Sequence, residues 1–123
     1  MTATIQDLVG QTITAVRKGD DTLEFDTAGH TYRFYHESDC CETVEIEDMI
    51  GDLDDLIGNP LLVAEEVTHE GVNPPDVPVK SDQDSFTWTF YRFQTIKGSV
   101  TVRWYGASNG YYSEKVDFME VTR

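Results

Sequence analysis

The sequence predicts an α+β domain, with a mainly antiparallel β-sheet of about seven or eight strands and one short acidic amphipathic helix packed on it. Most of the chain consists of short segments in which β-branched or aromatic residues alternate with polar ones, separated by Gly- and Asp-containing turns. One central segment instead shows the apolar spacing of a helix. With 123 residues, we expect residues 1–123 to form a single domain with one core.

The N-terminal third begins with one or two helical turns over residues 4–10, with Thr4 as the N-cap and Gly10 as the stop. Strands are then expected at 11–18, 22–26 and 30–36. Because tight Gly-containing turns separate them, we predict that these three strands form an antiparallel meander.

The central segment is predicted to continue with a strand at 43–47 and then a helix that begins at Asp48 and ends at the Gly58–Pro60 sequence. Its apolar face would consist of Met49, Ile50, Leu53, Leu56 and Ile57. Its opposite face would consist of Asp52, Asp54 and Asp55.

Beyond the helix, a strand is expected at 61–68, followed by a Pro-rich internal loop at 71–85. The next strand, 85–97, carries Phe86, Trp88 and Phe90 in alternation, and a hairpin turn at Lys97-Gly98 leads into a strand at 99–105. The Asn-Gly pair within 106–110 predicts a second hairpin turn, after which 111–121 would close the sheet with Val116 and Phe118 inward.

Charge is concentrated in one part of the chain. The net charge is −14, and residues 34–79 contain thirteen Asp and Glu but no Lys or Arg. Such a segment repels nucleic acids and anionic membranes, so direct binding to either is not expected. It favours a basic protein surface or a cation instead, although solubility alone also explains an acidic surface.

The predicted acidic helix carries the sharpest indication of a binding surface. Asp54 and Asp55 would lie near its C-terminus, where the helix dipole opposes negative charge unless a partner compensates. Small residues and tyrosines at the tip of the second hairpin are typical of a contact surface. The candidate partner-binding residues are therefore Glu45, Glu47, Asp52, Asp54, Asp55, Asn109, Tyr111 and Tyr112. The alternative is a solvated helix face and ordinary turn chemistry.

A second cluster contains side chains that could hold a ligand or metal, namely His36, Asp39, Cys40, Cys41 and Glu42. Zinc sites space their cysteines two to four residues apart, whereas adjacent residues of an extended chain point to opposite faces. We therefore expect structural cysteines and no metal or cofactor, with a strained vicinal disulfide as an alternative. The acidic run lacks the ligand pattern of an EF-hand.

No signature of an enzyme is present. The sequence contains no nucleophile elbow, P-loop or dinucleotide fingerprint, so catalysis is not expected, although a Cys–His pair of Cys40 or Cys41 with His36 is an alternative. The chain begins without a basic or apolar leader and has no run of membrane-spanning length. A cytoplasmic location is expected.

Two blocks, Tyr35–Val67 and Thr87–Phe118, resemble a family of small acidic proteins of tailed bacteriophages, notably actinobacteriophages, and of some bacteria. The family is an uncharacterised domain. The resemblance implies a phage or prophage origin and carries over no catalytic residue, substrate or site.

These observations lead to the hypothesis of a non-enzymatic binding protein whose acidic surface engages a basic host protein. In that role the carboxylates would occupy a site evolved for phosphates and inhibit a host or defence factor as a nucleic-acid mimic. The alternative is a module that sequesters a nucleotide signal or a divalent metal, which would need a metal ion or Arg92, Lys97 and Arg103 for the phosphates. The oligomeric state is not predicted.

Overall fold

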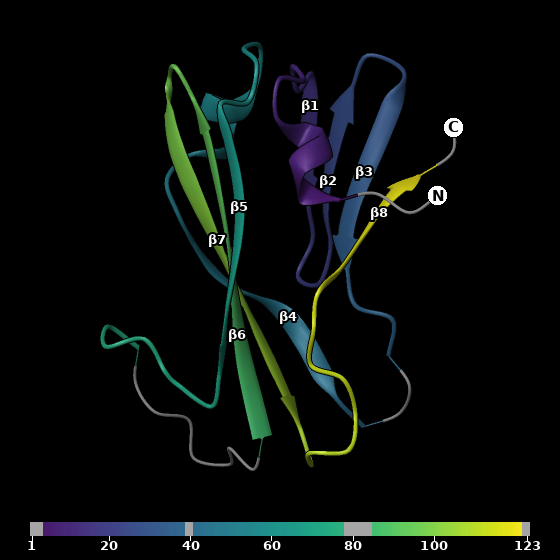
Figure 1. Ribbon diagram of the computed structural model, residues 1–123, viewed down its shortest axis with the longest axis vertical. Helices are drawn as coiled ribbons and strands as arrows, with labels where there is room; N and C mark the ends of the chain where they lie inside the picture. Colours follow the sequence, from purple (N-terminus) through teal and green to yellow (C-terminus); the bar gives the residue numbers. More distant parts are fainter. Residues whose placement is uncertain (1–3, 39–40, 78–84, 122–123) are drawn as a thin grey trace.

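The computed structural model describes residues 4–38, 41–77 and 85–121. Its strands form two four-stranded antiparallel sheets that pack face to face as a sandwich (Figure 1). The first sheet has the order β1-β2-β3-β8, with bounds Ala15–Lys18, Leu23–Thr27, His30–Tyr35 and Asp117–Val121. The second has the order β4-β7-β6-β5, with bounds Thr43–Ile50, Gly98–Ser108, Ser85–Thr95 and Val63–Glu70.

The predicted α+β class is wrong, because the described residues contain no α-helix and only two four-residue 3-10 turns, η1 (Ile5–Leu8) and η2 (Leu53–Leu56). Neither of these turns is long or apolar enough to cross a membrane. Most of the expected strands are confirmed, as are the β1-β2-β3 meander and the capping of η1 by Thr4.

The expected helix from Asp48 is replaced by a longer β4. The strand passes a bulge between Ile46 and Asp48 and keeps pairing with β7 as far as Ile50. Gly51 then turns the chain at a φ of 109°, a conformation that glycine tolerates best. The side chain of Asp52, rather than that of Asp48, caps the turn η2 by accepting a bond from the Asp54 N–H.

The second predicted hairpin is also wrong, because β7 continues through the Gly-Ala-Ser sequence to Ser108 while still paired with β6. Residues 109–116, here called the strap, then cross to the first sheet, where β8 pairs with β3. Val116 and Phe118 pack against the core as expected. In Figure 1 the strap runs beside the lower half of the second sheet before it reaches β8.

The core lies between the inner faces of the two sheets and is rich in aromatic side chains. Phe25 and Phe34 of the first sheet meet Phe93 of the second edge to face, with ring centroids 5.0 and 5.6 Å from it. Tyr91 packs on Phe34 in the same manner at 4.8 Å. All four side chains are fully or almost fully buried, so this aromatic contact joins the sheets.

The other alternating aromatic set of β6 lies on the outer face of the second sheet. Trp88 is nevertheless fully buried, because the Pro-rich segment, residues 71–77, folds back over it. The Trp88 Nε1–H donates to Asn73 Oδ1 at 3.1 Å. Arg103 of β7 donates to both oxygens of Asp48 and both of Asp76, which fastens the segment to the sheet.

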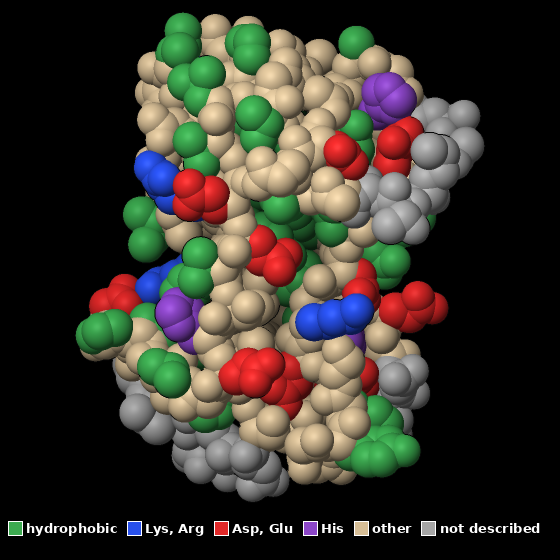
Figure 2. Space-filling view, viewed as in Figure 1, with side chains coloured by type: hydrophobic (Ala, Val, Ile, Leu, Met, Phe, Trp, Pro, Cys, Tyr) green, Lys and Arg blue, Asp and Glu red, His purple; other side chains and the backbone are tan. Residues whose placement is uncertain are grey.

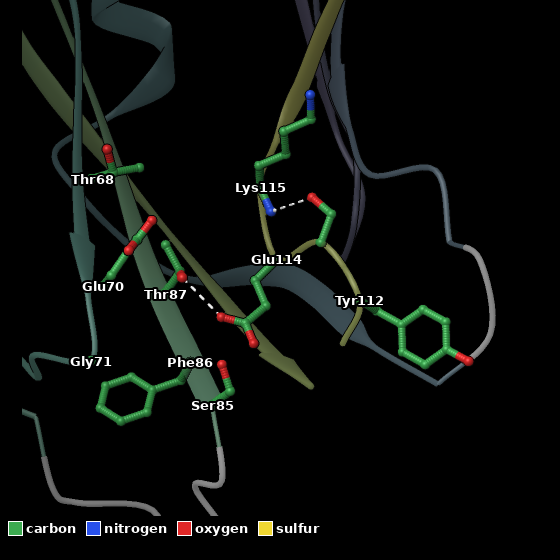
Figure 3. A pocket seen from close by; sticks show the side chains of 10 residues that line it. Thr68, Glu70, Gly71, Ser85, Phe86, Thr87, Tyr112, Glu114 and Lys115 are labelled. Carbon is green, nitrogen blue, oxygen red and sulfur yellow. Dashed lines mark hydrogen bonds between the residues drawn. The ribbon is translucent and has the colours of Figure 1, made fainter. Parts of the chain in front are cut away.

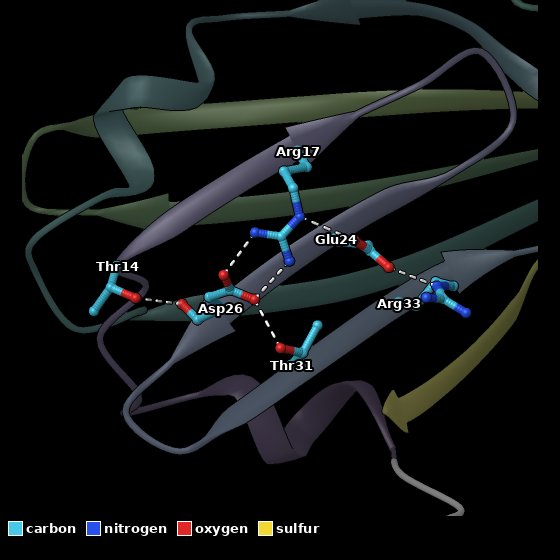
Figure 4. A network of polar contacts seen from close by, with 6 residues as sticks. All are labelled: Thr14, Arg17, Glu24, Asp26, Thr31 and Arg33. Carbon is cyan, nitrogen blue, oxygen red and sulfur yellow. Dashed lines mark hydrogen bonds and ion pairs between the residues drawn. The ribbon is translucent and has the colours of Figure 1, made fainter. Parts of the chain in front are cut away.

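The outer face of the first sheet is a self-neutralised polar surface (Figure 4). Arg17 donates to both oxygens of Asp26, at 2.6 and 2.7 Å, and to Glu24 at 3.0 Å. Arg33 donates to the other oxygen of Glu24 at 2.6 Å. The hydrogen bonds from Arg33 and Arg17 lower the pKa of the Glu24 carboxyl. With its charges paired across neighbouring strands, this face offers little net charge to a partner.

Candidate functional site

A cavity of about 660 Å3 opens between the lower ends of β5 and β6 on one side and the strap on the other (Figure 3). We call it the cleft. Figure 2 shows acidic side chains around the hollowed centre of this face of the molecule. The lining side chains mix hydroxyls, carboxylates, one ammonium and aromatic rings, and come from Thr68, Glu70, Ser85, Phe86, Thr87, Tyr112, Ser113, Glu114 and Lys115.

Strand register explains why β5 turns carboxylates toward the interior of the sandwich. Paired residues of neighbouring strands point to the same face, and Glu66 is paired with Tyr91, whose side chain lies in the core. By the alternation of the strand, Thr68 and Glu70 share that face. The inner face of β5 thus changes from apolar at Ala64 to polar from Glu66 onward, where the strap replaces the first sheet as its opposite wall.

The strap is held close to the second sheet by glycine and by hydrogen bonds. A Cβ at Gly106 would lie 2.5 Å from the Glu114 carbonyl oxygen, so only glycine allows the strap to cross β7 here. Glu114 accepts hydrogen bonds from the Thr87 hydroxyl at 2.8 Å and from the Ser108 hydroxyl. These contacts fix the Glu114 carboxylate as part of the wall of the cleft.

A buried His–Glu contact anchors the C-terminal end of the strap. His36 Nε2 lies 3.0 Å from Glu42 Oε2, and both side chains are almost completely buried. His36 Nδ1 lies 2.7 Å from the Lys115 carbonyl oxygen. Because a carbonyl can only accept, Nδ1 is the donor in this contact. The pair ties the crossover from β3 to β4 to the strap.

The electrostatic balance of the cleft is negative. Glu70 and Glu114 line it, and Lys115, the one lining cation among the described residues, lies 3.8 Å from Asp117. Burial and a hydrogen bond to the Glu66 carboxylate raise the pKa of the Tyr91 phenol, and the charge of Asp117 raises it further. Two carboxylates line the cleft and two more lie beside it, against one solvent-exposed ammonium, so the cleft favours positively charged groups.

Two buried polar atoms beside the cleft have no hydrogen-bond partner among the described residues. They are Thr89 Oγ1 and Trp104 Nε1. Thr89 is paired with Thr68 of the cleft on one side and with Trp104 on the other, so these atoms lie on adjacent rows of the inner face. Buried polar groups are nearly always satisfied by protein, water or ligand. The inner end of the cleft is therefore polar and incompletely satisfied by the chain itself.

The predicted partner-binding residues are not brought together on one surface. Glu45 and Glu47 belong to β4, at the opposite edge of the second sheet from β5, and Asp52, Asp54 and Asp55 belong to the η2 region. Asn109, Tyr111 and Tyr112 lie on the strap, where Tyr111 is 85% exposed and packs edge to face on Tyr112. Tyr112 alone of this set lines the cleft.

Of the predicted ligand cluster, the structure brings together His36 and Glu42, which bond to each other. Cys41 is exposed and disulfide-bonded, and the sequence contains one other cysteine, Cys40. Asp39 and Cys40 lie outside the described residues. Within the ranges that the structure describes, no group of three or more His, Cys, Asp or Glu is arranged to hold a metal ion.

The basic residues considered for phosphate binding are engaged elsewhere. Arg103 is bonded to Asp48 and Asp76 under the Pro-rich segment. Arg92 lies 3.7 Å from Glu65 on the outer face of the second sheet, and Lys97 approaches the Ile57 carbonyl at 3.4 Å. The three cations do not converge on the cleft, so this arrangement gives no support to a nucleotide site.

The sequence analysis missed the cleft residues Glu70 and Glu114 and the neighbouring Glu66. The signal for Glu66 and Glu70 was the polarity of one face of β5, where Ala64 is followed at alternate positions by Glu66, Thr68 and Glu70. A strand whose inner face becomes charged must leave the core at that point. Glu114 had no such signal, since its position depends on the path of the strap.

A family described as a domain of unknown function, DUF7448, matches residues 6–118. The chain belongs to the DUF7448 family. The match includes both sheets up to the start of β8 and every residue that lines the cleft. No curated protein and no solved structure matches this DUF7448 chain.

Proposed function

We propose that this DUF7448 protein is a non-enzymatic binding protein whose cleft receives positively charged groups of a partner. The observation that carries the proposal is a cavity of about 660 Å3 lined by Glu70, Glu114 and one lysine, Lys115. Two further carboxylates lie beside it, Glu66 next to Tyr91 and Asp117 at 3.8 Å from the lysine. The buried Thr89 hydroxyl beside the cleft, which has no partner among the described residues, supports a site that a bound molecule completes.

The partner in this proposal is a basic host protein, and the protein itself is of phage or prophage origin. The resemblance of its two blocks to small phage proteins supports the origin, and the net charge of −14 supports a basic partner. A broad nucleic-acid mimic would need carboxylates in a row on one surface. Because β4 and β5 place theirs at opposite edges of the second sheet, a local contact at the cleft is favoured.

The test is titration calorimetry with a short oligolysine peptide at low and moderate salt. The double variant Glu66→Gln/Glu70→Gln is expected to weaken binding roughly fivefold, since each exposed ion pair contributes a few tenths to about 1 kcal/mol. The matched control is Asp52→Asn/Asp54→Asn, which removes the same charge near η2. Equal weakening by both variants would show that net charge alone attracts the peptide and would refute a site at the cleft.

A second candidate is a small cationic ligand in the same cavity, because a volume of about 660 Å3 is within the range of small-molecule sites. A thermal-shift measurement with spermidine, and with ATP in the presence and absence of EDTA, tests it. We expect stabilisation by spermidine alone, since the cleft repels phosphates. Stabilisation by ATP that EDTA abolishes would instead support a metal-dependent nucleotide module.

A further inference from the structure

The lower half of β5 is an open edge of the second sheet. The strand is the last in the order β4-β7-β6-β5 and, among the described residues, pairs with β6 alone. Its first part is covered, because Gln6 Nε2 donates to the Ala64 carbonyl at 3.2 Å. Just before the strand, the Gly10 N–H donates to the Leu61 carbonyl at 2.8 Å. From residue 65 to residue 70 every residue is exposed.

The hydrogen-bond pattern identifies which backbone groups at this edge are free. The Gly71 N–H donates across the pair to the Phe86 carbonyl at 2.9 Å, and bonded residues alternate along an antiparallel pair. The odd-numbered residues of β5 therefore bond to β6. The even-numbered Glu66, Thr68 and Glu70 direct both N–H and C=O away from β6. Ala64 is also even-numbered, and its carbonyl accepts a hydrogen bond from Gln6 and not from β6.

The same three residues also turn their side chains into or toward the cleft. Glu66 shares the inner face with Tyr91, and Thr68 and Glu70 line the cavity itself. A strand added at this edge would present alternate side chains beside these carboxylates. Its other side chains would lie beside Glu65, Val67 and His69 on the outer face. Charge complementarity selects lysine or arginine at the inner positions.

We propose that an extended segment of the partner pairs with β5 as a fifth strand of the second sheet and places alternate Lys or Arg side chains in the cleft. This binding mode rests on the proposed function and specifies how the basic partner is held. Backbone pairing would supply affinity, and the carboxylates would supply the preference for basic side chains. A second copy of the chain is disfavoured as the occupant, because its own β5 would bring a second set of glutamates to the same edge.

Amide hydrogen exchange tests the pairing directly. The probe is a short acetylated and amidated peptide in which lysine and threonine alternate. Bound peptide is expected to slow exchange at the Glu66, Thr68 and Glu70 amides. The Glu65, Val67 and His69 amides already bond to β6 and serve as internal controls, changing little. Protection confined to other parts of the chain would overturn the proposal.

Two modifications remove pairing while keeping charge. Thr68→Pro deletes one free N–H without breaking a bond to β6, and the same peptide methylated on alternate backbone nitrogens cannot pair. Each is expected to weaken binding roughly tenfold, as loss of one or two hydrogen bonds predicts. Thr68→Val is the matched control, because it keeps the N–H and a β-branched side chain.

The outcomes separate the two proposals. If Glu66→Gln/Glu70→Gln weakens binding but Thr68→Pro and N-methylation do not, the acidic cleft stands and strand pairing is wrong. If no basic peptide binds, both proposals fail. A concentration-dependent dimer in sedimentation that Thr68→Pro abolishes would show that a second copy occupies the edge, and would overturn the assignment to a basic partner.

Discussion

The two edges of the second sheet are protected in different ways. At the β4 edge, the strand is bulged between Ile46 and Asp48, and the Ile46 N–H donates to the Asp20 carbonyl of the β1–β2 turn at 2.8 Å. At the β5 edge, the pairing is regular over its whole length and nothing among the described residues covers residues 65–70. Both devices, bulging and charge, prevent uncontrolled pairing of sheets.

The two kinds of edge protection differ in how they respond to a partner. A partner of opposite charge can overcome the negative charge at the β5 edge, whereas the bulge and the covering turn at the β4 edge stay in place. A bulged and covered edge cannot accept a strand without unfolding part of the sandwich. An edge protected by glutamates rejects acidic or apolar strands but accepts a basic one, because the repulsion becomes attraction. In the proposed binding mode, the β4 edge serves stability and the β5 edge serves recognition.

Proline substitution on each edge gives the largest expected contrast. Ile46→Pro removes the bond to Asp20 and part of a buried side chain, and is expected to lower the free energy of unfolding by about 3 kcal/mol or more. Thr68→Pro should cost about 1 kcal/mol or less, since the lost N–H is free. Urea denaturation measures both. Equal losses would contradict the division between a structural and an open edge.

The second contrast concerns one arginine near each edge. Arg103→Met leaves Asp48 and Asp76 without their common partner, and the Arg103 side chain is only 10% exposed. We expect a loss of about 2 kcal/mol in the free energy of unfolding. Arg92→Met, beside Glu65 near β5, removes a half-exposed pair at 3.7 Å and should cost under about 0.5 kcal/mol. A larger loss for Arg92→Met would reverse the comparison.

The smallest effect is the pH response of the Pro-rich segment that covers the outer face. The hydrogen bond from Arg103 lowers the pKa of the Asp76 carboxyl, so the stabilising contact is fully present above the ordinary aspartate pKa of about 4 and is lost as pH falls through the lowered value. The Trp88 indole N–H resonance should stay constant from neutral pH to about 4 and move only below it. Movement near pH 6 would show that another group controls the segment.

Local sequence patterns predicted the strands well, because alternation and turn residues act over a few positions. The meander of the first sheet and the cap at Thr4 were confirmed on that basis. The helix was mispredicted because Met49, Ile50 and Leu53 also fit a strand that is followed by a turn. Pairing of Met49 with Val102 decided in favour of the strand.

The prediction of the second hairpin was wrong for a related reason. An Asn-Gly pair allows a tight turn but does not require the next strand to pair with the previous one. Here the chain leaves the sheet after Ser108, and Phe118 pairs with Phe34 of the other sheet. That long-range contact places Glu114 opposite Thr87 and so creates one wall of the cleft.

The sequence alone determined the antiparallel β-character of the chain, its alternating faces and its large excess of negative charge, because each of these depends on neighbouring residues or on composition. Only the tertiary structure decided which face of a strand is buried and which edge is covered. The two aromatic sets of β6 show the reason, since either could have formed the core until contacts with Phe34 and Asn73 placed one inside and the other under the Pro-rich segment.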